Sequence, residues 1–187
     1  MSRIGRKPIK IPAGVDVKID AGHVRLRGPK GELEMSLPAG VTVAIDNGCL
    51  NVCDPVANRS NRGFQGLGRA LLANMMQGVT EGYNKRLDIC GVGYRAEVKG
   101  GILTLSVGLS HTVALSVPAG LDVVVGKAET VGGLPATPLL VSGIDKQLVG
   151  EFTARVAAVR PPEPYKGKGI KLAGRRYIRK AGKSGAK

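Results

Sequence analysis

Residues 28–43 read GPKGELEMSLPAGVTV, and residues 108–123 read GLSHTVALSVPAGLDV. The two stretches align without a gap at an offset of 80 residues and share six identical positions, including the uncommon tripeptide Pro-Ala-Gly. The identities pair Gly28 with Gly108, Ser36 with Ser116, Pro38 with Pro118, Ala39 with Ala119, Gly40 with Gly120 and Val43 with Val123. Two copies are too few for a solenoid, so we interpret the chain as a tandem duplication.

Short runs of alternating apolar and polar residues surround the repeated stretch in both halves. They predict strands at residues 15–19 and 24–27 in the first half, and at residues 87–92 and 102–107 in the second. Three turn sequences separate strands and are typical of hairpins: Gly28-Pro29-Lys30-Gly31, Asp46-Asn47-Gly48 and Gly100-Gly101. Each half therefore begins with a small antiparallel sheet.

One helix is predicted to close each half, because apolar residues recur there at spacings of three and four. They are Phe64, Leu67, Leu71, Met75 and Val79 in the first half, and Leu148, Phe152, Val156 and Val159 in the second. A sheet with one covering helix is a two-layer unit. We therefore predict an α+β fold of two tandem duplicated domains, residues 1–82 and 83–160, each a small antiparallel sheet covered by one helix, with basic N- and C-terminal extensions.

The excess positive charge lies at the two ends of the chain. The formal net charge is +14, of which residues 161–187 contribute +8 and the first ten residues +4. A nearly neutral body with basic ends favours a polyanion as the partner. Aromatic residues make up 3% of the chain and there is no Trp, which provides few rings for stacking on bases. If the partner is RNA, we expect contacts to phosphate and shape rather than base-by-base reading.

Several other functions lack a motif. Gly182-Lys183-Ser184 has no earlier P-loop glycine, and Gly91-Val92-Gly93 lacks the third glycine of a dinucleotide fingerprint, so a strand bulge or bend is the plainer interpretation there. Carboxylates are scattered singly, and Cys49, Cys53 and Cys90 are best interpreted as strand or core cysteines. We expect no enzyme activity, cofactor or metal. No apolar run predicts a signal peptide or membrane span, so a soluble, cytoplasmic protein is expected.

The segment after the second helix carries the strongest signal for binding. Arg160-Pro161-Pro162-Glu163-Pro164 predicts an abrupt helix end and a stiff exit. In Tyr165-Lys166-Gly167-Lys168-Gly169-Ile170, lysines alternate with glycines, which would let the main chain approach phosphates closely. A solvated, disordered tail is the alternative. We place residues 161–187 outside the domains, so substitutions at Gly167 and Gly169 are expected to leave the fold untouched.

The stretch PEPYKGKGI, residues 162–170, resembles the signature of bacterial large-subunit ribosomal protein L6. The opening MSRIGRKPI and the stretches GPKGEL, RALLANMMQGVTEGY, GVGYRA and SGIDKQLVGEF resemble that family too. The resemblance implies two tandem α+β domains, no catalysis and a place on large-subunit ribosomal RNA near the sarcin–ricin loop and the stalk base. Implied partners are that RNA, neighbouring ribosomal proteins at the stalk base and possible translation factors, without a membrane.

The family's RNA contacts are carried over onto the signature. Together with the charge pattern, the expected RNA-binding residues are Tyr165, Lys166, Gly167, Lys168, Gly169, Lys171, Arg175, Arg176, Arg179, Lys180, Arg160, Arg3, Arg6 and Lys7.

The chain departs from the family pattern in two places. Residues 126–138 form a longer loop, interpreted as a tolerated surface insertion, and Leu172 stands where the family more often has an aromatic. A nucleic-acid chaperone acting away from the ribosome and an RNA-modifying enzyme are the alternative functions.

Overall fold

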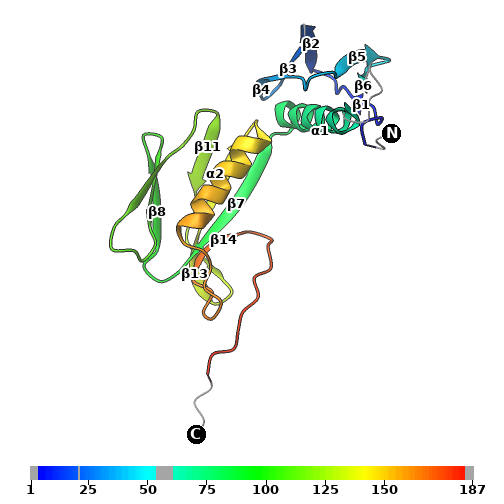
Figure 1. The fold of residues 1–187 in the computed structure, drawn as a ribbon. Coiled ribbons are helices and arrows are strands. Elements are labelled where there is room, and N and C mark those ends of the chain that lie inside the picture. Colours follow the sequence, from blue (N-terminus) through cyan, green and yellow to red (C-terminus); the bar gives the residue numbers. More distant parts are fainter. Residues whose placement is uncertain (1–3, 21, 54–60, 184–187) are drawn as a thin grey trace. The chain divides into compact units, whose positions relative to one another are not determined.

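The computed structural model describes residues 4–20, 22–53 and 61–183. It divides into two compact units (Figure 1). Unit 1 contains Met1–Tyr83 and Ile144–Lys146, and unit 2 contains Asn84–Gly143 and Gln147–Lys187. Both units combine antiparallel strands with a helix, so the predicted α+β class with tandem duplicated domains is confirmed.

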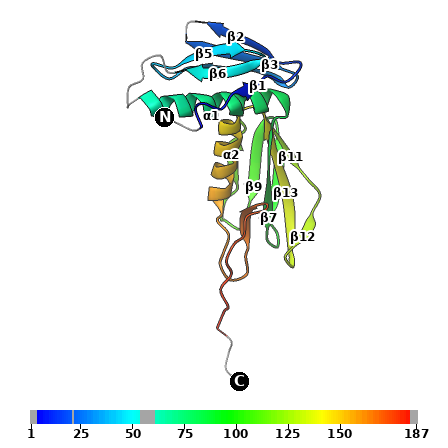
Figure 2. The ribbon, with the colours of Figure 1, turned by 90° about the vertical axis from the view of Figure 1, so that its right-hand side faces the viewer.

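Unit 1 consists of two three-stranded sheets and one helix. One sheet has the order β2-β3-β4 and the other the order β1-β6-β5. Figure 2 shows both lying over α1. The elements are β1 (Ile9–Lys10), β2 (Asp16–Asp20), β3 (His23–Gly28), β4 (Gly31–Ser36), β5 (Thr42–Asp46), β6 (Cys49–Cys53) and α1 (Asn61–Thr80).

The first helix forms as predicted, but its buried face agrees with the predicted one only in part. Val79 of the predicted stripe is buried, whereas Phe64 and Leu67 are 44% and 48% exposed, and Leu72 and Met76 are buried instead. The core of unit 1 is completed by Ile9, Val24, Leu26, Leu50 and Val52 of the strands and by Val41 just before β5. The prediction was wrong at the start of the helix because it followed the large apolar residues and gave no weight to the helix glycines.

Unit 2 has one three-stranded sheet, β10-β9-β8, and a five-stranded sheet of order β11-β13-β7-β14 with β12 paired to β13. Figures 1 and 2 show α2 lying along the larger sheet. The elements are β7 (Tyr83–Cys90), β8 (Arg95–Lys99), β9 (Ile102–Ser106), β10 (Val113–Ser116), β11 (Leu121–Val125), β12 (Glu129–Val131), β13 (Leu134–Gly143), α2 (Lys146–Val159) and β14 (Gly169–Leu172). Phe152 and Val156 of α2 are buried with Leu87, Ile89 and Leu139 of the sheet.

The two units repeat one strand order. The order β1-β6-β5 in unit 1 corresponds to β7-β13-β11 in unit 2. The repeated Pro-Ala-Gly forms the same turn twice: the Val41 N–H donates to the Pro38 carbonyl at 3.2 Å, and the Leu121 N–H donates to the Pro118 carbonyl at 3.3 Å. Gly40 and Gly120 both have a positive φ, at 78° and 87°. This conformation favours glycine and explains its recurrence.

Two connecting segments are defined by the structure. Residues 126–138, expected as a longer loop, contain β12 and the start of β13, which pair antiparallel with Thr130 opposite Pro135, so this loop is built as a hairpin. Gly91-Val92-Gly93 lies in the connection between β7 and β8, where the chain bends at Gly91 and the Tyr94 N–H donates to the Gly91 carbonyl at 3.3 Å. Of the two interpretations given for it, the bend is confirmed and the strand bulge is wrong.

Candidate nucleic-acid interface

The segment after α2 is part of unit 2's sheet. Its residues Gly169–Leu172 form β14, which pairs antiparallel with β7 and places Ile170 opposite Ile89. Ile170 is fully buried, and its N–H donates to the Arg160 carbonyl at 2.8 Å. The expectation that everything after Arg160 lies outside the fold was therefore wrong. Pairing with a strand some 80 residues earlier is a non-local effect that the local Lys/Gly pattern does not reveal.

Residues preceding β14 form a closed loop. The Glu163 N–H donates to the Lys168 carbonyl at 2.7 Å, which closes the turn that contains Tyr165 and Lys166. The Lys180 N–H donates to the Pro164 carbonyl at 2.8 Å, so the chain returns to this loop after β14. The signature residues are thus held from both sides by main-chain hydrogen bonds.

A short turn after β14 orients the next basic residues. The Leu172 N–H donates to Tyr177 Oη at 3.0 Å, and the Arg175 N–H donates to the Leu172 carbonyl at 3.2 Å. The Arg175 guanidinium lies 5.6 Å from the centre of the Tyr177 ring, within range of a cation–π interaction. This part of the C-terminal segment is anchored, contrary to the alternative of a disordered tail.

The two signature glycines are required by the fold. Gly167 is buried with φ +72°, and a Cβ there would lie 2.9 Å from Arg179 Nε. Gly169 has φ +129°, and a Cβ there would lie 2.7 Å from both the Pro161 carbonyl oxygen and Pro162 Cα. The expectation that substitutions at these glycines leave the fold untouched is therefore wrong, because the main chain of residues 161–162 occupies the space that a side chain at Gly169 would need.

The structure brings most of the predicted RNA-binding residues together in unit 2. Exposed members are Arg160, Tyr165, Lys166, Arg175, Arg176, Arg179 and Lys180, while Lys168 and Lys171 are half-buried. Arg6 and Lys7 are exposed in unit 1, where Arg69 Nε donates to the Lys7 carbonyl at 3.3 Å, and Arg3 lies outside the described residues. The C-terminal set belongs to unit 2, and the N-terminal residues belong to unit 1.

Sequence reasoning missed a polar cluster beside β14. Arg86 donates to Asp88 Oδ1 and to Glu129 Oε2, both at 2.8 Å, and so joins β7 to the β12–β13 hairpin. These hydrogen bonds raise the pKa of Arg86. Burial raises the pKa of the neighbouring Cys90 thiol; Lys171 acts in the opposite direction. No sequence signal could have identified the cluster, because it depends on the pairing of β7 with β14 and on the position of the hairpin.

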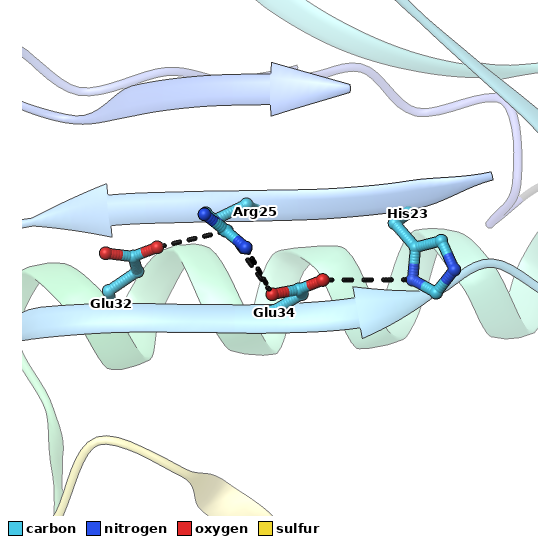
Figure 3. A network of polar contacts seen from close by, with 4 residues as sticks. All are labelled: His23, Arg25, Glu32 and Glu34. Carbon is cyan, nitrogen blue, oxygen red and sulfur yellow. Dashed lines mark hydrogen bonds and ion pairs between the residues drawn. The ribbon is translucent and has the colours of Figure 1, made fainter. Parts of the chain in front are cut away.

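Unit 1 also carries a charged cluster, but its charges compensate one another. Figure 3 shows Arg25 of β3 between Glu32 and Glu34 of β4. The distances are 3.1 Å from Arg25 Nε to Glu32 Oε1 and 2.8 Å from Arg25 Nη2 to Glu34 Oε2. The hydrogen bond to Glu34 and the nearby carboxylates raise the pKa of Arg25. This face of the sheet therefore offers little net positive charge to a polyanion.

Metal ligation, free thiols and membrane insertion are the remaining features that bear on function. Within residues 4–20, 22–53 and 61–183, no group of three or more His, Cys, Asp or Glu side chains is placed to hold a metal ion. Cys49 and Cys53 stand at the two ends of β6, and Cys90 is buried in β7; all three are free thiols. In the described chain, neither helix is long and apolar enough to cross a membrane.

Comparisons with known proteins identify relatives over the whole chain. The model of the family described as "Ribosomal protein L6" matches residues 11–82 and 90–172. The large ribosomal subunit protein uL6 of Parasynechococcus marenigrum is 51% identical over 187 residues, covering 100% of both chains. The protein of the same name from Natranaerobius thermophilus is 45% identical over 185 residues, covering 99% of each chain. The similarity includes both repeats and β14.

Proposed function

Because the chain belongs to the ribosomal protein L6 family, we propose that it is a structural component of the large ribosomal subunit that binds the ribosomal RNA of that subunit. Membership of this family confirms that the chain is not an enzyme. We further propose that it binds near the sarcin–ricin loop and the stalk base, where neighbouring proteins and translation factors would be its protein contacts. The resemblance of the signature at residues 162–170 supports this location.

The observation that carries the proposal is the anchored basic surface of unit 2. Residues 161–187 have nine Lys or Arg and one acid. Within this segment, main-chain hydrogen bonds tie residues 163–180 to β7, to Arg160 at the end of α2 and to one another. Basic side chains on an ordered scaffold lose less conformational freedom on binding than side chains on a disordered tail. The C-terminal segment of unit 2 is therefore the main RNA contact in this proposal, and Arg3, Arg6 and Lys7 form a secondary contact.

The proposed mechanism is stabilisation of RNA packing. Lys166, Lys168, Arg175, Arg176 and Lys180 each neutralise a phosphate, which reduces the repulsion between RNA strands that approach the protein. Tyr165 is 53% exposed next to Lys166 and can cover a sugar or a base without reading its sequence. The two-unit body supplies rigid surfaces and performs no chemistry.

Salt dependence tests the electrostatic part of the proposal. If about six to eight basic side chains meet phosphates, the log–log slope of RNA affinity against salt concentration should be about −4 to −7. Filter binding of the full-length chain to a transcript of large-subunit ribosomal RNA measures this slope. A slope near −1 would show that the basic segment does not bind RNA.

A paired comparison tests the assignment to unit 2. Replacing Lys166 and Lys168 by Ala should weaken binding more than replacing Arg6 and Lys7 by Ala, although each change removes two charges. Equal losses would refute the main site. Co-sedimentation with large subunits through a high-salt gradient separates a ribosomal component from a chaperone, because a loosely bound chaperone would be released.

A further inference from the structure

Lys171 and Arg179 bring their cationic groups to one point above Gly167. An atom at the Cβ position of Gly167 would lie 2.9 Å from Arg179 Nε, 3.0 Å from Arg179 Nη2 and 3.1 Å from Lys171 Nζ. Because the Lys171 ammonium and the Arg179 guanidinium both lie this close to a single point, the two cationic groups are near neighbours. Gly167 is buried beneath these two side chains, and because it has no side chain of its own both cationic groups can approach its main chain closely.

No carboxylate of the described residues lies within ion-pairing distance of these two cations. Asp88 lies opposite Lys171 across the β7–β14 pair, but its carboxylate and that of Glu129 are both bound by Arg86. In the part of the chain that the structure describes, neither Lys171 nor Arg179 takes part in an ion pair within 4.0 Å. Two like charges this close repel each other. An anion that contacts both is attracted to each of them, and this attraction offsets the repulsion.

Three segments hold the two cations in place. Lys171 is part of β14, and the hydrogen bond from the Lys180 N–H to the Pro164 carbonyl fixes the main chain next to Arg179. On the other side, a Cβ at Gly132, in the turn of the β12–β13 hairpin, would lie 3.2 Å from Arg179 Nη2. The Arg179 guanidinium thus lies between the hairpin and Gly167. A site ordered before binding loses less entropy when the ligand arrives.

We propose that Lys171 and Arg179 form a seat for a single phosphate of the RNA backbone. The planar guanidinium offers two N–H donors to one phosphate, and the ammonium adds a third from the side of β14. The hairpin of residues 126–138 acts in this seat by positioning Arg179. The inference rests on the RNA-binding function proposed above. It adds that Lys171 and Arg179 share one phosphate, whereas each of the other basic side chains meets a phosphate of its own.

The salt slope distinguishes a shared phosphate from separate ones. Lys171→Ala and Arg179→Ala each leave one cation at the seat, so each should weaken RNA binding about tenfold at fixed salt while nearly keeping the slope. The double variant should lose the phosphate and reduce the slope by about 0.7–0.9. Arg176→Ala and Lys180→Ala serve as controls, since each should reduce the slope by that amount alone.

The measurement is filter binding of full-length variants to a transcript of large-subunit ribosomal RNA, with circular dichroism to confirm folding. If both single variants at the seat reduce the slope as the controls do, or if the double variant leaves it unchanged, the shared seat is wrong while RNA binding stands. If the unmodified chain does not bind the transcript, the proposed function fails and the seat fails with it.

A glycine pair tests the contribution of the hairpin. Gly132 and Gly133 both have positive φ, at 59° and 81°, so an alanine at either position suffers comparable backbone strain. Only the Cβ at Gly132 reaches Arg179, because a Cβ at Gly133 has no atom within 4 Å. Gly132→Ala should therefore weaken RNA binding more than Gly133→Ala. Equal binding by the two variants would overturn the positioning role of the hairpin.

Discussion

Gly169→Ala should destabilise unit 2 rather than act only on RNA binding. Gly169 has φ +129°, a conformation that costs a residue with a side chain about 1–3 kcal/mol. The added Cβ would also lie 2.7 Å from the Pro161 carbonyl oxygen, and relieving such overpacking costs about 1–3 kcal/mol. The two effects act in the same place, so the free energy of unfolding should fall by about 2–6 kcal/mol.

Gly174→Ala is the matched control. Gly174 also has a positive φ, at 79°, but a Cβ there meets no atom within 4 Å. Only the backbone strain applies, so the expected loss is about 1–2 kcal/mol. The excess loss of Gly169→Ala over Gly174→Ala therefore reports the contact between Gly169 and the main chain of residues 161–162 together with the stricter backbone requirement at φ +129°.

Hydrogen exchange by mass spectrometry on the full-length chain is the suitable assay, because two units need not unfold together. A loss of about 2 kcal/mol or more corresponds to exchange accelerated by roughly thirtyfold or more in β7 and β14, for amides that open with the whole unit. Peptides of α1 and β3 provide the internal reference. Equal acceleration by Gly169→Ala and Gly174→Ala would refute the steric argument, and no acceleration by either would refute the assignment of β14 to the sheet.

Three further outcomes are expected. Leu72 is fully buried in unit 1, so Leu72→Ala should destabilise that unit by about 2–5 kcal/mol and accelerate exchange in β3 and β6 but not in β7. Burial raises the pKa of the Cys90 thiol, which lowers its thiolate fraction at a given pH. Iodoacetamide at pH 8 should therefore modify the exposed Cys53 well before the buried Cys90, as measured by mass spectrometry of the peptides. Equal rates of modification would contradict this. Glu163 is the one acid in residues 161–187, so Glu163→Gln should strengthen binding to the RNA transcript by roughly two- to fivefold at low salt, with a smaller gain at high salt.

The features that the sequence predicted correctly depend on local backbone chemistry. Asn47 and Gly48 both have positive φ, at 48° and 70°, which is the conformation that a two-residue hairpin turn requires. Gly100 and Gly101 do the same between β8 and β9, at 57° and 75°. Because such turns are determined by the residues within them, the hairpins and the duplication could be predicted from a single sequence.

The helix face could not be predicted from its apolar stripe because glycines form part of the contact. A Cβ at Gly68 would lie 3.5 Å from Val41 Cγ1, and Gly78 is buried against the main chain of Ile144. Small residues let the helix approach its neighbours closely, so the buried face includes positions that a hydrophobicity pattern counts as neutral. Phe64 and Leu67, which carry the strongest apolar signal, lie on the exposed side.

The candidate site was predicted by residue type but not by arrangement. The Lys/Gly alternation identified residues 165–170 and the family resemblance added Lys171, yet the position of Lys171 follows from its pairing with Asp88 across two strands. The contact of Arg179 with Gly132 joins residues that are nearly 50 positions apart. Such contacts follow from tertiary packing, and local patterns do not contain them.

The duplicated halves retain one scaffold but use its sheet edge differently. Among the described residues of unit 1, the edge strand β1 pairs with β6 alone, whereas its counterpart β7 pairs with β13 and also with β14. Even a repeated residue has changed its role: a Cβ at Gly28 would collide with Val79 of α1, while Gly108 occupies a turn at φ +72°.

The extra strand on β7 carries Lys171 and anchors the basic residues that follow it, so a single addition to a sheet edge supplies both a structural element and a charged surface. Unit 1 has no such strand among its described residues, and on the outer face of its sheet Arg25 is neutralised by Glu32 and Glu34. The larger excess of positive charge at the C-terminal end, +8 against +4 in the first ten residues, thus corresponds to a structural asymmetry between two otherwise similar units.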